Sequence, residues 1–323
     1  MIQDPVLVND WHVVARSSDL PVGKVLRVRL LGEDMVLWRS SSGSVMAWQD
    51  LCIHRGARLS LGWVSNDRLV CPYHGWEYDV NGVCVRIPAH PDQKPPMKAR
   101  VKTYRAVERY GYIWVSLGDP KADVPYFAEW YDSSFRKIYC GPYRIRSSGP
   151  RAIENFLDVA HFPFVHAGLL GDPSRPEIPD YEVVRTEEGI VARNIRVWQP
   201  NPDGTGVGRW ETYTYKVLRP LTAYFTKESD GKVFSIFYTV TPVEQIESIG
   251  WMIMAMNYAH EVPEEQIRSF EDKIVSQDIP VVESQRPELL PLDLQAELHL
   301  RSDKISIAYR MWLRELGLTF GTA

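Results

Sequence analysis

The residues best suited to metal chemistry are two cysteine–histidine pairs in the first quarter of the chain. Cys52 and His54 are one residue apart, Cys71 and His74 are two apart, and sixteen residues separate the pairs. Two thiolates and two imidazoles can close a structural zinc site. They can also hold an iron–sulfur cluster in which cysteines bind one iron and histidines the other. Because each loop supplies one residue of each kind, so that two loops can clasp a cluster from both sides, the pattern favours the cluster.

Glycines accompany both pairs. Gly56, Gly62 and Gly75 allow the backbone to approach closely, as N–H···S bonds to a cluster require. The chain has four cysteines, and the other two, Cys84 and Cys140, have no histidine beside them. We expect these two to be ordinary buried thiols. This cysteine usage suits metal binding in a reducing cytoplasm better than a disulfide framework.

A second group of candidate ligands lies in "ENFLDVAHFPFVHAG", residues 154–168. Asn155, Asp158 and His161 are three residues apart, so we expect them along one side of a helix. On a regular helix His166 would point about 140° away from His161. Pro163 should kink or end the helix between them, which would let His166 turn toward the same point. Two imidazoles and one carboxylate on one side of an iron leave positions open for dioxygen.

The carboxylate has to come from elsewhere, and a helix expected over 263–285 offers one. Asp278 extends an apolar stripe on that helix, where a bare carboxylate is costly unless it is paired or bound to metal. Asp272 points away from the stripe and Glu283 is rotated by about 140° from Asp278. Asp278 is therefore the predicted third ligand, and Pro280 is expected to break the helix just after it. The alternative is that these histidines and carboxylates are ordinary hydrogen-bonded groups. The stripe comprises Ile267, Phe270 or Glu271, Ile274 and Asp278.

Both segments resemble one known family. "CIHRGARLSLG…VCPYHGWEYD" is similar to the Rieske motif of ring-hydroxylating oxygenases at both loops. "N-x-x-D-x-x-H-x-x-x-x-H" resembles the mononuclear-iron motif of Rieske non-haem iron oxygenases, position by position. The resemblance implies one 2Fe–2S cluster and one Fe(II) per chain. The implied cluster ligands are Cys52, His54, Cys71 and His74; the implied iron ligands are His161, His166 and Asp278; Asn155 and Asp158 are the further implied catalytic residues.

The family also implies an assembly and an electron source. In a head-to-tail homotrimer, Asp158 would link His161 to His74 of the next chain, accepting a hydrogen bond from each ring. Electrons would come from a separate NAD(P)H-dependent reductase, a ferredoxin, or both. The chain has no G-x-G-x-x-G after a strand and no flavin signature, which agrees with a separate reductase.

The implied activity is that of a terminal oxygenase, which uses dioxygen to mono-oxygenate a small organic substrate. The chain length is similar to that of the phthalate and vanillate group. "IPAHPDQKPP" and "AYRMWLRELGLTFG" are similar to saxitoxin-type Rieske hydroxylases, which implies hydroxylation at a C–H bond. Oxidative demethylation and cis-dihydroxylation of an aromatic substrate are alternatives within the same chemistry. A Rieske electron carrier without catalysis and a zinc-stapled binding protein are alternatives from other classes.

The order of the expected elements along the chain predicts an α+β protein with two domains. Residues 1–147 consist of short β-prone runs, which indicates an all-β Rieske domain. Residues 148–323 are expected to form the iron-binding catalytic domain, an antiparallel sheet flanked by helices, the last of them over 308–317. Nine residues from the expected strands of this domain are candidates to line a pocket, although we expect most of them to pack in the core of the sheet. They are Tyr213, Tyr215, Tyr224, Phe225, Phe234, Phe237, Tyr238, Trp251 and Met254.

Composition limits the remaining function classes. The 323 residues carry a formal net charge of −4, so general binding to nucleic acid or to an anionic membrane is not expected. The longest apolar runs, such as residues 250–256, are too short to cross a bilayer. The N-terminus lacks the order of basic, apolar and small residues found in a signal peptide. These features favour a cytoplasmic enzyme.

Overall fold

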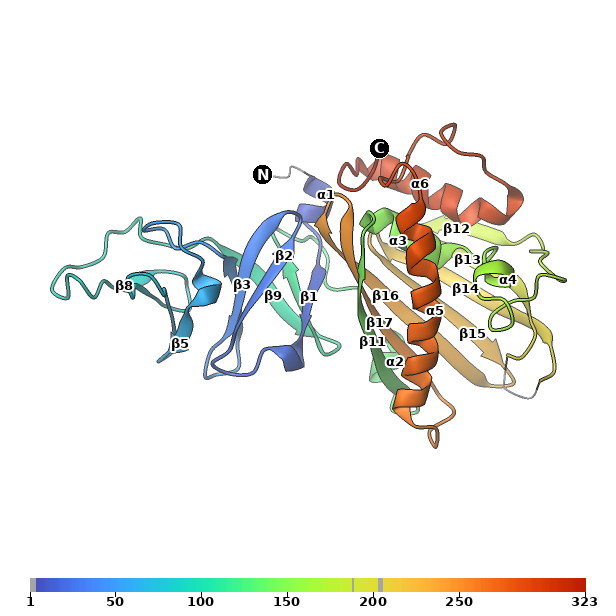
Figure 1. The fold of residues 1–323 in the computed structure, drawn as a ribbon, viewed down its shortest axis with the longest axis horizontal. Helices are drawn as coiled ribbons and strands as arrows, with labels where there is room; N and C mark the ends of the chain where they lie inside the picture. Colours follow the sequence, from blue (N-terminus) through green and yellow to red (C-terminus); the bar gives the residue numbers. More distant parts are fainter. Residues whose placement is uncertain (1–3, 188, 203–205) are drawn as a thin grey trace. The chain divides into compact units, whose positions relative to one another are not determined.

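The computed structural model describes residues 4–187, 189–202 and 206–323, and the chain divides into two compact units, Met1–Val124 and Pro125–Ala323 (Figure 1). This division lies before the predicted boundary at 147. The reason is strand β11 (Arg136–Ile145), which pairs with β17 (Glu247–Met256) from Arg136↔Met256 to Ile145↔Ser248. A strand bonded along its length to the second sheet folds with that sheet.

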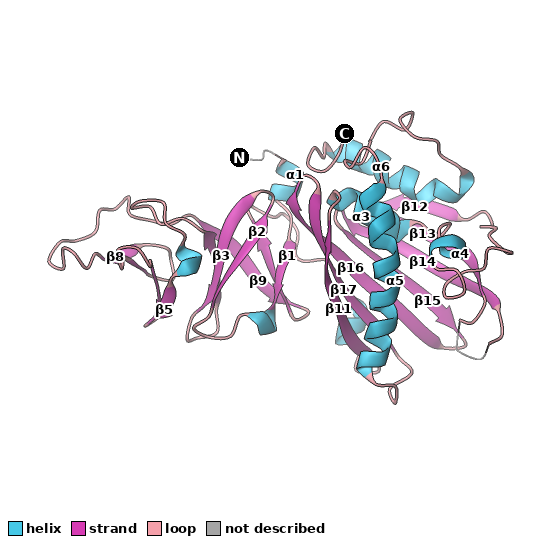
Figure 2. Cartoon of the chain, in the orientation of Figure 1, coloured by secondary structure: helices cyan, strands magenta, loops and turns pink. Residues whose placement is uncertain are grey.

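The first unit is built from strands, as predicted (Figure 2). Its described residues form a six-stranded sheet in the order β1-β10-β9-β4-β3-β2 and a four-stranded sheet in the order β5-β6-β7-β8. The strands are β1 (His12–Arg16), β2 (Val25–Leu30), β3 (Glu33–Arg39), β4 (Val45–Gln49), β5 (Trp63–Ser65), β6 (Arg68–Val70), β7 (Glu77–Tyr78), β8 (Cys84–Arg86), β9 (Thr103–Arg109) and β10 (Tyr112–Ser116). The short helices are α1 (Pro5–Val8), η1 (Ser17–Asp19) and η2 (Leu59–Leu61).

Aromatic residues and the two loop cysteines share the core beside the smaller sheet. The buried rings of Trp38 and Trp48 meet edge to face with centroids 5.1 Å apart. Cys52, Cys71 and Tyr78 belong to the same buried cluster. The loops that carry the predicted cluster ligands are therefore anchored by their cysteines in the core of this unit.

The second unit is an antiparallel sheet with helices, which confirms the predicted fold class. Over the described residues the strands run in the order β11-β17-β16-β15-β14-β13-β12. The remaining strands are β12 (Glu182–Thr186), β13 (Gly189–Gln199), β14 (Arg209–Arg219), β15 (Thr222–Ser229) and β16 (Lys232–Glu244). The helices are α2 (Ala128–Tyr131), α3 (Gly149–Leu157), α4 (Phe162–Val165), α5 (Glu264–Ser284), η3 (Arg301–Asp303) and α6 (Lys304–Leu316).

Long helices pack on the sheet, with α3 against β15–β17, α5 against β11, and α6 against β12 and β13 (Figures 1 and 2). Helix α5 matches the predicted range of 263–285. Helix α6 ends at Gly317, which adopts the left-handed conformation that glycine favours at this position. Among the described residues, no helix is both long enough and apolar enough to cross a membrane.

Candidate metal centres

The two cysteine–histidine loops have the same local structure. Gly56 donates its backbone N–H to the carbonyl of Cys52, and Gly75 donates to Cys71 in the same way, at 2.9 and 3.0 Å. Both glycines have positive φ, of 72° and 68°, a conformation that residues with a side chain rarely adopt. Each glycine thus closes a tight turn over its cysteine.

The turns place thiols inward and imidazoles outward. Cys52 and Cys71 are 2% and 1% exposed and contact each other, and the Tyr78 hydroxyl donates to the Cys52 Sγ over 3.1 Å. The Nδ1 atoms of His54 and His74 face each other at 3.2 Å.

The two thiols share a hydrogen bond that lowers the pKa of Cys52 and raises the pKa of Cys71. The hydrogen bond from Cys71 lowers the pKa of Cys52, and the backbone N–H of His54 adds to that effect. Backbone N–H groups of Tyr73 and His74 face the Cys71 sulfur. Paired thiols, paired ring nitrogens and N–H···S bonds fit a cluster that takes cysteines on one iron and histidines on the other.

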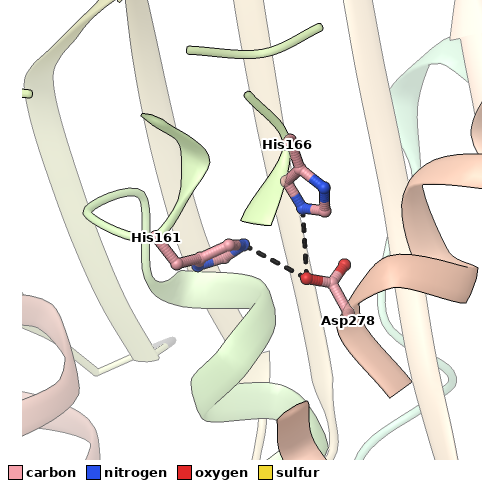
Figure 3. A group of neighbouring side chains, drawn as sticks. All are labelled: His161, His166 and Asp278. Carbon is pink, nitrogen blue, oxygen red and sulfur yellow. Dashed lines mark ion pairs between the residues drawn. The ribbon is translucent and has the colours of Figure 1, made fainter. Parts of the chain in front are cut away.

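In the second unit His161, His166 and Asp278 converge on one point (Figure 3). The Oδ1 atom of Asp278 lies 3.3 Å from the Nε2 of His161 and 3.1 Å from the Nε2 of His166. The two rings are inclined by 69°, so both Nε2 atoms face the carboxylate without stacking. Sequence reasoning had named these three residues, and the structure brings them together from two distant segments.

The path of the chain to this point differs from the prediction. Helix α3 ends at Leu157 with Asp158 as its C-cap, so Asn155, Asp158 and His161 do not share one helix. His161 and His166 instead flank α4, a single turn with Pro163 in its first positions. Proline is tolerated there because an N–H in the first turn has no partner within the helix. Pro163 therefore starts a helix rather than ending one.

The predicted break at Pro280 was also wrong. Helix α5 continues through Pro280 to Ser284. Proline removes one bond of the helix ladder, but one lost bond need not end a helix whose other residues are packed. Asp278 consequently lies inside a helix and is held by turns on both sides.

Neighbouring side chains hold the outer nitrogen of each ring. The Nδ1–H of His166 donates to the Oε1 of Gln277 over 2.9 Å. The Nδ1 of His161 lies 3.3 Å from the Oδ2 of Asp158, whose Oδ1 accepts the backbone N–H of Ala160. These contacts leave both Nε2 lone pairs free to face Asp278.

The inner atoms need a cation. The Nε2 of His166 and the Oδ1 of Asp278 are buried without a hydrogen-bond partner in the described residues. Burial alone lowers the pKa of His161, but Asp158 and Asp278 outweigh it and raise the pKa to about 9. Burial alone raises the pKa of Asp278, but the two imidazoles outweigh it and lower it. Two imidazoles and one carboxylate with open flanks suit a non-haem iron.

The three residues open on a cavity of about 580 Å³ between the helices and the sheet. Every second side chain of a strand faces this cavity, because successive side chains of a strand point to opposite faces of the sheet. Six of the nine named candidates line it, more than expected: Tyr213, Tyr215, Phe225, Phe234, Tyr238 and Met254. Tyr224 and Phe237 instead pack around Phe127 on the other side of the sheet, and Trp251 bonds to Thr241.

Sequence families account for most of the chain. The Rieske [2Fe-2S] domain matches residues 10–105, and the vanillate O-demethylase oxygenase C-terminal domain matches residues 145–319. The second match spans more than half of the chain and covers all three converging residues. The chain belongs to the Rieske non-haem iron oxygenases.

Individual relatives agree over nearly the full length. Methylxanthine N1-demethylase NdmA of Pseudomonas putida is 34% identical over 95% of this chain and 88% of its own. The structure of that protein with caffeine superposes with a TM-score of 0.84 and 33% identity, covering 96% of this chain and 91% of its own. The vanillate O-demethylase oxygenase subunit of a Pseudomonas strain is 29% identical over 91% of this chain and 90% of its own.

A further relative matches only part of the chain. Oxidoreductase NdmD of Pseudomonas putida is 46% identical over 36% of this chain and 20% of its own.

This Rieske oxygenase is an oxidoreductase of the terminal-oxygenase type, which mono-oxygenates a small organic substrate with dioxygen and electrons supplied to it. Its family carries a 2Fe–2S cluster and a mononuclear non-haem iron. The matches therefore exclude the zinc-stapled protein, and the C-terminal oxygenase domain excludes an electron carrier without catalysis.

Two residues of the site escaped sequence reasoning. Gln277 gave no signal, because a glutamine beside a predicted ligand is equally common on a solvated helix face. Phe156 stacks on Phe225 and Tyr238 in the cavity, and it gave no signal because a phenylalanine on a helix is as common in a core as in a pocket.

Proposed function

We propose that this Rieske oxygenase removes a methyl group from a nitrogen of a flat heteroaromatic ring. The observation that carries the proposal is the position of His161, His166 and Asp278 at the wall of an aromatic cavity of about 580 Å³. Tyrosine and phenylalanine rings bind flat rings by offset stacking and edge contacts. The similarity to a methylxanthine N1-demethylase and to a vanillate O-demethylase supports oxidation of a methyl group in particular.

Demethylation requires only the mono-oxygenation that defines the class. One oxygen atom of dioxygen enters a methyl C–H bond, and the other leaves as water after two electrons and two protons are supplied. The resulting N–CH2–OH group then breaks its C–N bond, which releases formaldehyde and leaves an N–H. The chain itself has to place the methyl group against the metal site and keep bulk water away.

His161, His166 and Asp278 would hold the iron, which when bound supplies the activation of dioxygen. Gln277 and Asp158 would fix the two imidazoles, and Asn155 lines the cavity beside them. The cluster would be held by Cys52, His54, Cys71 and His74.

The predicted domains and assembly belong to the same proposal. The first unit would form the cluster domain and the second unit the catalytic domain of a cytoplasmic homotrimer. The Asp158 side chain is 36% exposed although it contacts His161, so a second imidazole can reach it. His74 is exposed as well and is proposed as that second imidazole, from the next chain. A separate NAD(P)H-dependent reductase, a ferredoxin, or both would deliver the electrons.

Turnover by the iron-loaded protein tests the proposal. Caffeine and theobromine would be supplied separately with NADH and a generic reductase, and oxygen uptake, formaldehyde and the ring product would be measured. We expect formaldehyde and an N-demethylated ring in equal amounts from at least one of them. A hydroxylated product that keeps its methyl groups, or oxygen uptake that neither compound stimulates, would refute N-demethylation of such rings.

A further inference from the structure

Glu271 is a buried acid at the cavity that neither belongs to the proposed iron ligands nor contacts their imidazoles. It lies on α5, lines the cavity and is 8% exposed. Its carboxyl group has no hydrogen bond or ion pair to any residue that the structure describes. A buried carboxyl group without a partner is costly and rarely occurs without a cause.

The other buried acids of this unit do have partners. Glu154 receives two hydrogen bonds from Arg310, and Glu211 receives one from Arg209. Glu129 pairs with Tyr224. Glu271 differs from all three because it lines the cavity and no basic or hydroxyl group among the described residues bonds to its carboxyl group.

Helix geometry relates Glu271 to the iron site. It precedes Asp278 by seven residues, which places both on the same side of α5 and about 10 Å apart along the axis. Ile274 lies between them and lines the cavity too. A flat molecule lying along this side of α5 can therefore reach both carboxyl groups at once.

The surroundings suit a nitrogen donor. Burial, followed by the charges of Asp278 and Asp272, raises the pKa of Glu271 to about 7. Both neighbouring charges are negative, so a positive group that donates a hydrogen bond would offset the repulsion as well as the lost hydration. Tyr213 and Tyr215 lie within electrostatic range of Glu271, and tyrosine faces also attract cations.

We propose that Glu271 selects substrates by accepting a hydrogen bond from a cationic nitrogen at the end of the molecule remote from the oxidised carbon. The ligand class is an amidinium or a guanidinium carried on a flat apolar frame. Glu271 is thus a specificity residue of the proposed oxygenase site, and this assignment rests on that proposed function. Asp278 keeps its separate place at the metal.

A pair of isosteric probes tests this assignment. Benzamidinium and benzamide have the same shape, but only the first is a cation. Their binding to the iron-loaded protein would be measured by calorimetry without oxygen or reductant, in the wild type, Glu271→Gln and Glu271→Leu. Asp272→Asn is the control, because Asp272 is the adjacent acid but bonds to Tyr143 and does not line the cavity.

We expect the wild type and Asp272→Asn to bind benzamidinium about ten-fold or more tightly than benzamide, as for a hydrogen bond between charged groups. Both Glu271 variants should lose that preference. Equal affinity for the two probes in the wild type, failure to bind either, or a preference that survives Glu271→Gln would overturn the assignment. Because binding is measured without turnover, the result stands whether or not methylated rings are oxidised.

Discussion

At the scale of single residues, the iron site is a set of three side chains whose inner atoms face one point. His161 and His166 have their outer nitrogens held and their inner nitrogens aimed at Asp278. All three would bind the same iron, so a substitution at any one of them should disturb that single site. Substitutions that remove an inner ligand and those that remove an outer contact should therefore differ in severity.

Removing the carboxylate ligand should abolish iron binding at this site alone. We expect Asp278→Ala to lose the mononuclear iron and turnover and to keep the visible spectrum of the cluster, because the cluster ligands lie in the other unit. Iron analysis and absorption spectra of the purified variant check this. Asp272→Asn should keep all three irons per chain. An active Asp278→Ala enzyme would show that another carboxylate is the ligand.

Removing an outer contact should weaken the site without destroying it. Gln277→Leu leaves the His166 ring without its acceptor, so the ring can rotate and present the wrong nitrogen. We expect iron affinity to fall by about 10- to 100-fold, measured by competition with a chelator. Gln277→Glu, which keeps an acceptor, should restore much of the loss. An unchanged affinity in Gln277→Leu would remove Gln277 from the site.

Glu271 should make stability depend on pH. Its pKa is about 7 in the folded protein, above the ordinary value of 4.5 that applies when it is unfolded. Between these values only the unfolded state has lost the proton, so stability falls as pH rises from 4.5 to 7. Substrate-free Glu271→Gln should therefore exceed the wild type in unfolding free energy by up to about 3 kcal/mol above pH 7. Urea denaturation at pH 5 and pH 8 tests this, and a difference that does not grow with pH contradicts it.

At the scale of elements, the site depends on how α3 is fixed, because the chain leaves α3 directly for Asp158 and His161. Glu154 on α3 receives hydrogen bonds of 2.5 and 2.7 Å from the Nε and Nη2 of Arg310 on α6. Both residues are less than 10% exposed. A helix far along the chain thus holds the segment that leads to the iron.

Breaking that pair should be costly. Arg310→Met leaves the buried Glu154 with only Arg151, 3.7 Å away, as a basic neighbour, which we expect to lower the unfolding free energy by about 3–5 kcal/mol. Replacing both partners, in Glu154→Leu with Arg310→Met, should recover most of the loss because no charge remains buried alone. Thermal unfolding of the single and double variants provides the measurement. A double variant as unstable as the single one would show that packing, and not charge, holds the two helices.

Elements also show where sequence reasoning succeeds and where it fails. The stripe on α5 was readable because Ile267, Ile274 and Asp278 repeat at helical spacing over a long segment. The end of α3 at Leu157 was not readable, since Asn155, Asp158 and His161 have a spacing that a continuous helix would also give. Glu271 could have been found by the argument used for Asp278, because it lies on the same stripe. The partners of His166 and Glu154 depend on tertiary contacts that no local pattern contains.

At the scale of the whole molecule, sequence predicted two modules and their order but placed the division late. Residues 125–147 carry β-prone runs like those of the first module, so composition does not change there. Only the pairing of β11 with β17 assigns them to the second sheet. The two predicted metal sites therefore belong to separately built units.

Asp158 is the proposed connection, and its loss should separate metal binding from electron transfer. With iron supplied at saturation, we expect Asp158→Ala to hold both metals, while product formed in a single turnover from the prereduced enzyme falls by about 10- to 100-fold. Asp132→Ala, at an exposed aspartate of the same unit, is the matched control. Rapid-quench measurements would decide, and unchanged single-turnover rates in Asp158→Ala would exclude the bridging role.

The layered build of the second unit has an evolutionary consequence. The groups that converge on the metal come from helices and their flanking turns, whereas most of the aromatic wall comes from the strands. Mutations in β14 to β17 can thus remodel the shape of the chamber and leave the oxidising apparatus intact. A lineage of such proteins can change the small molecules that it accepts through substitutions in these strands.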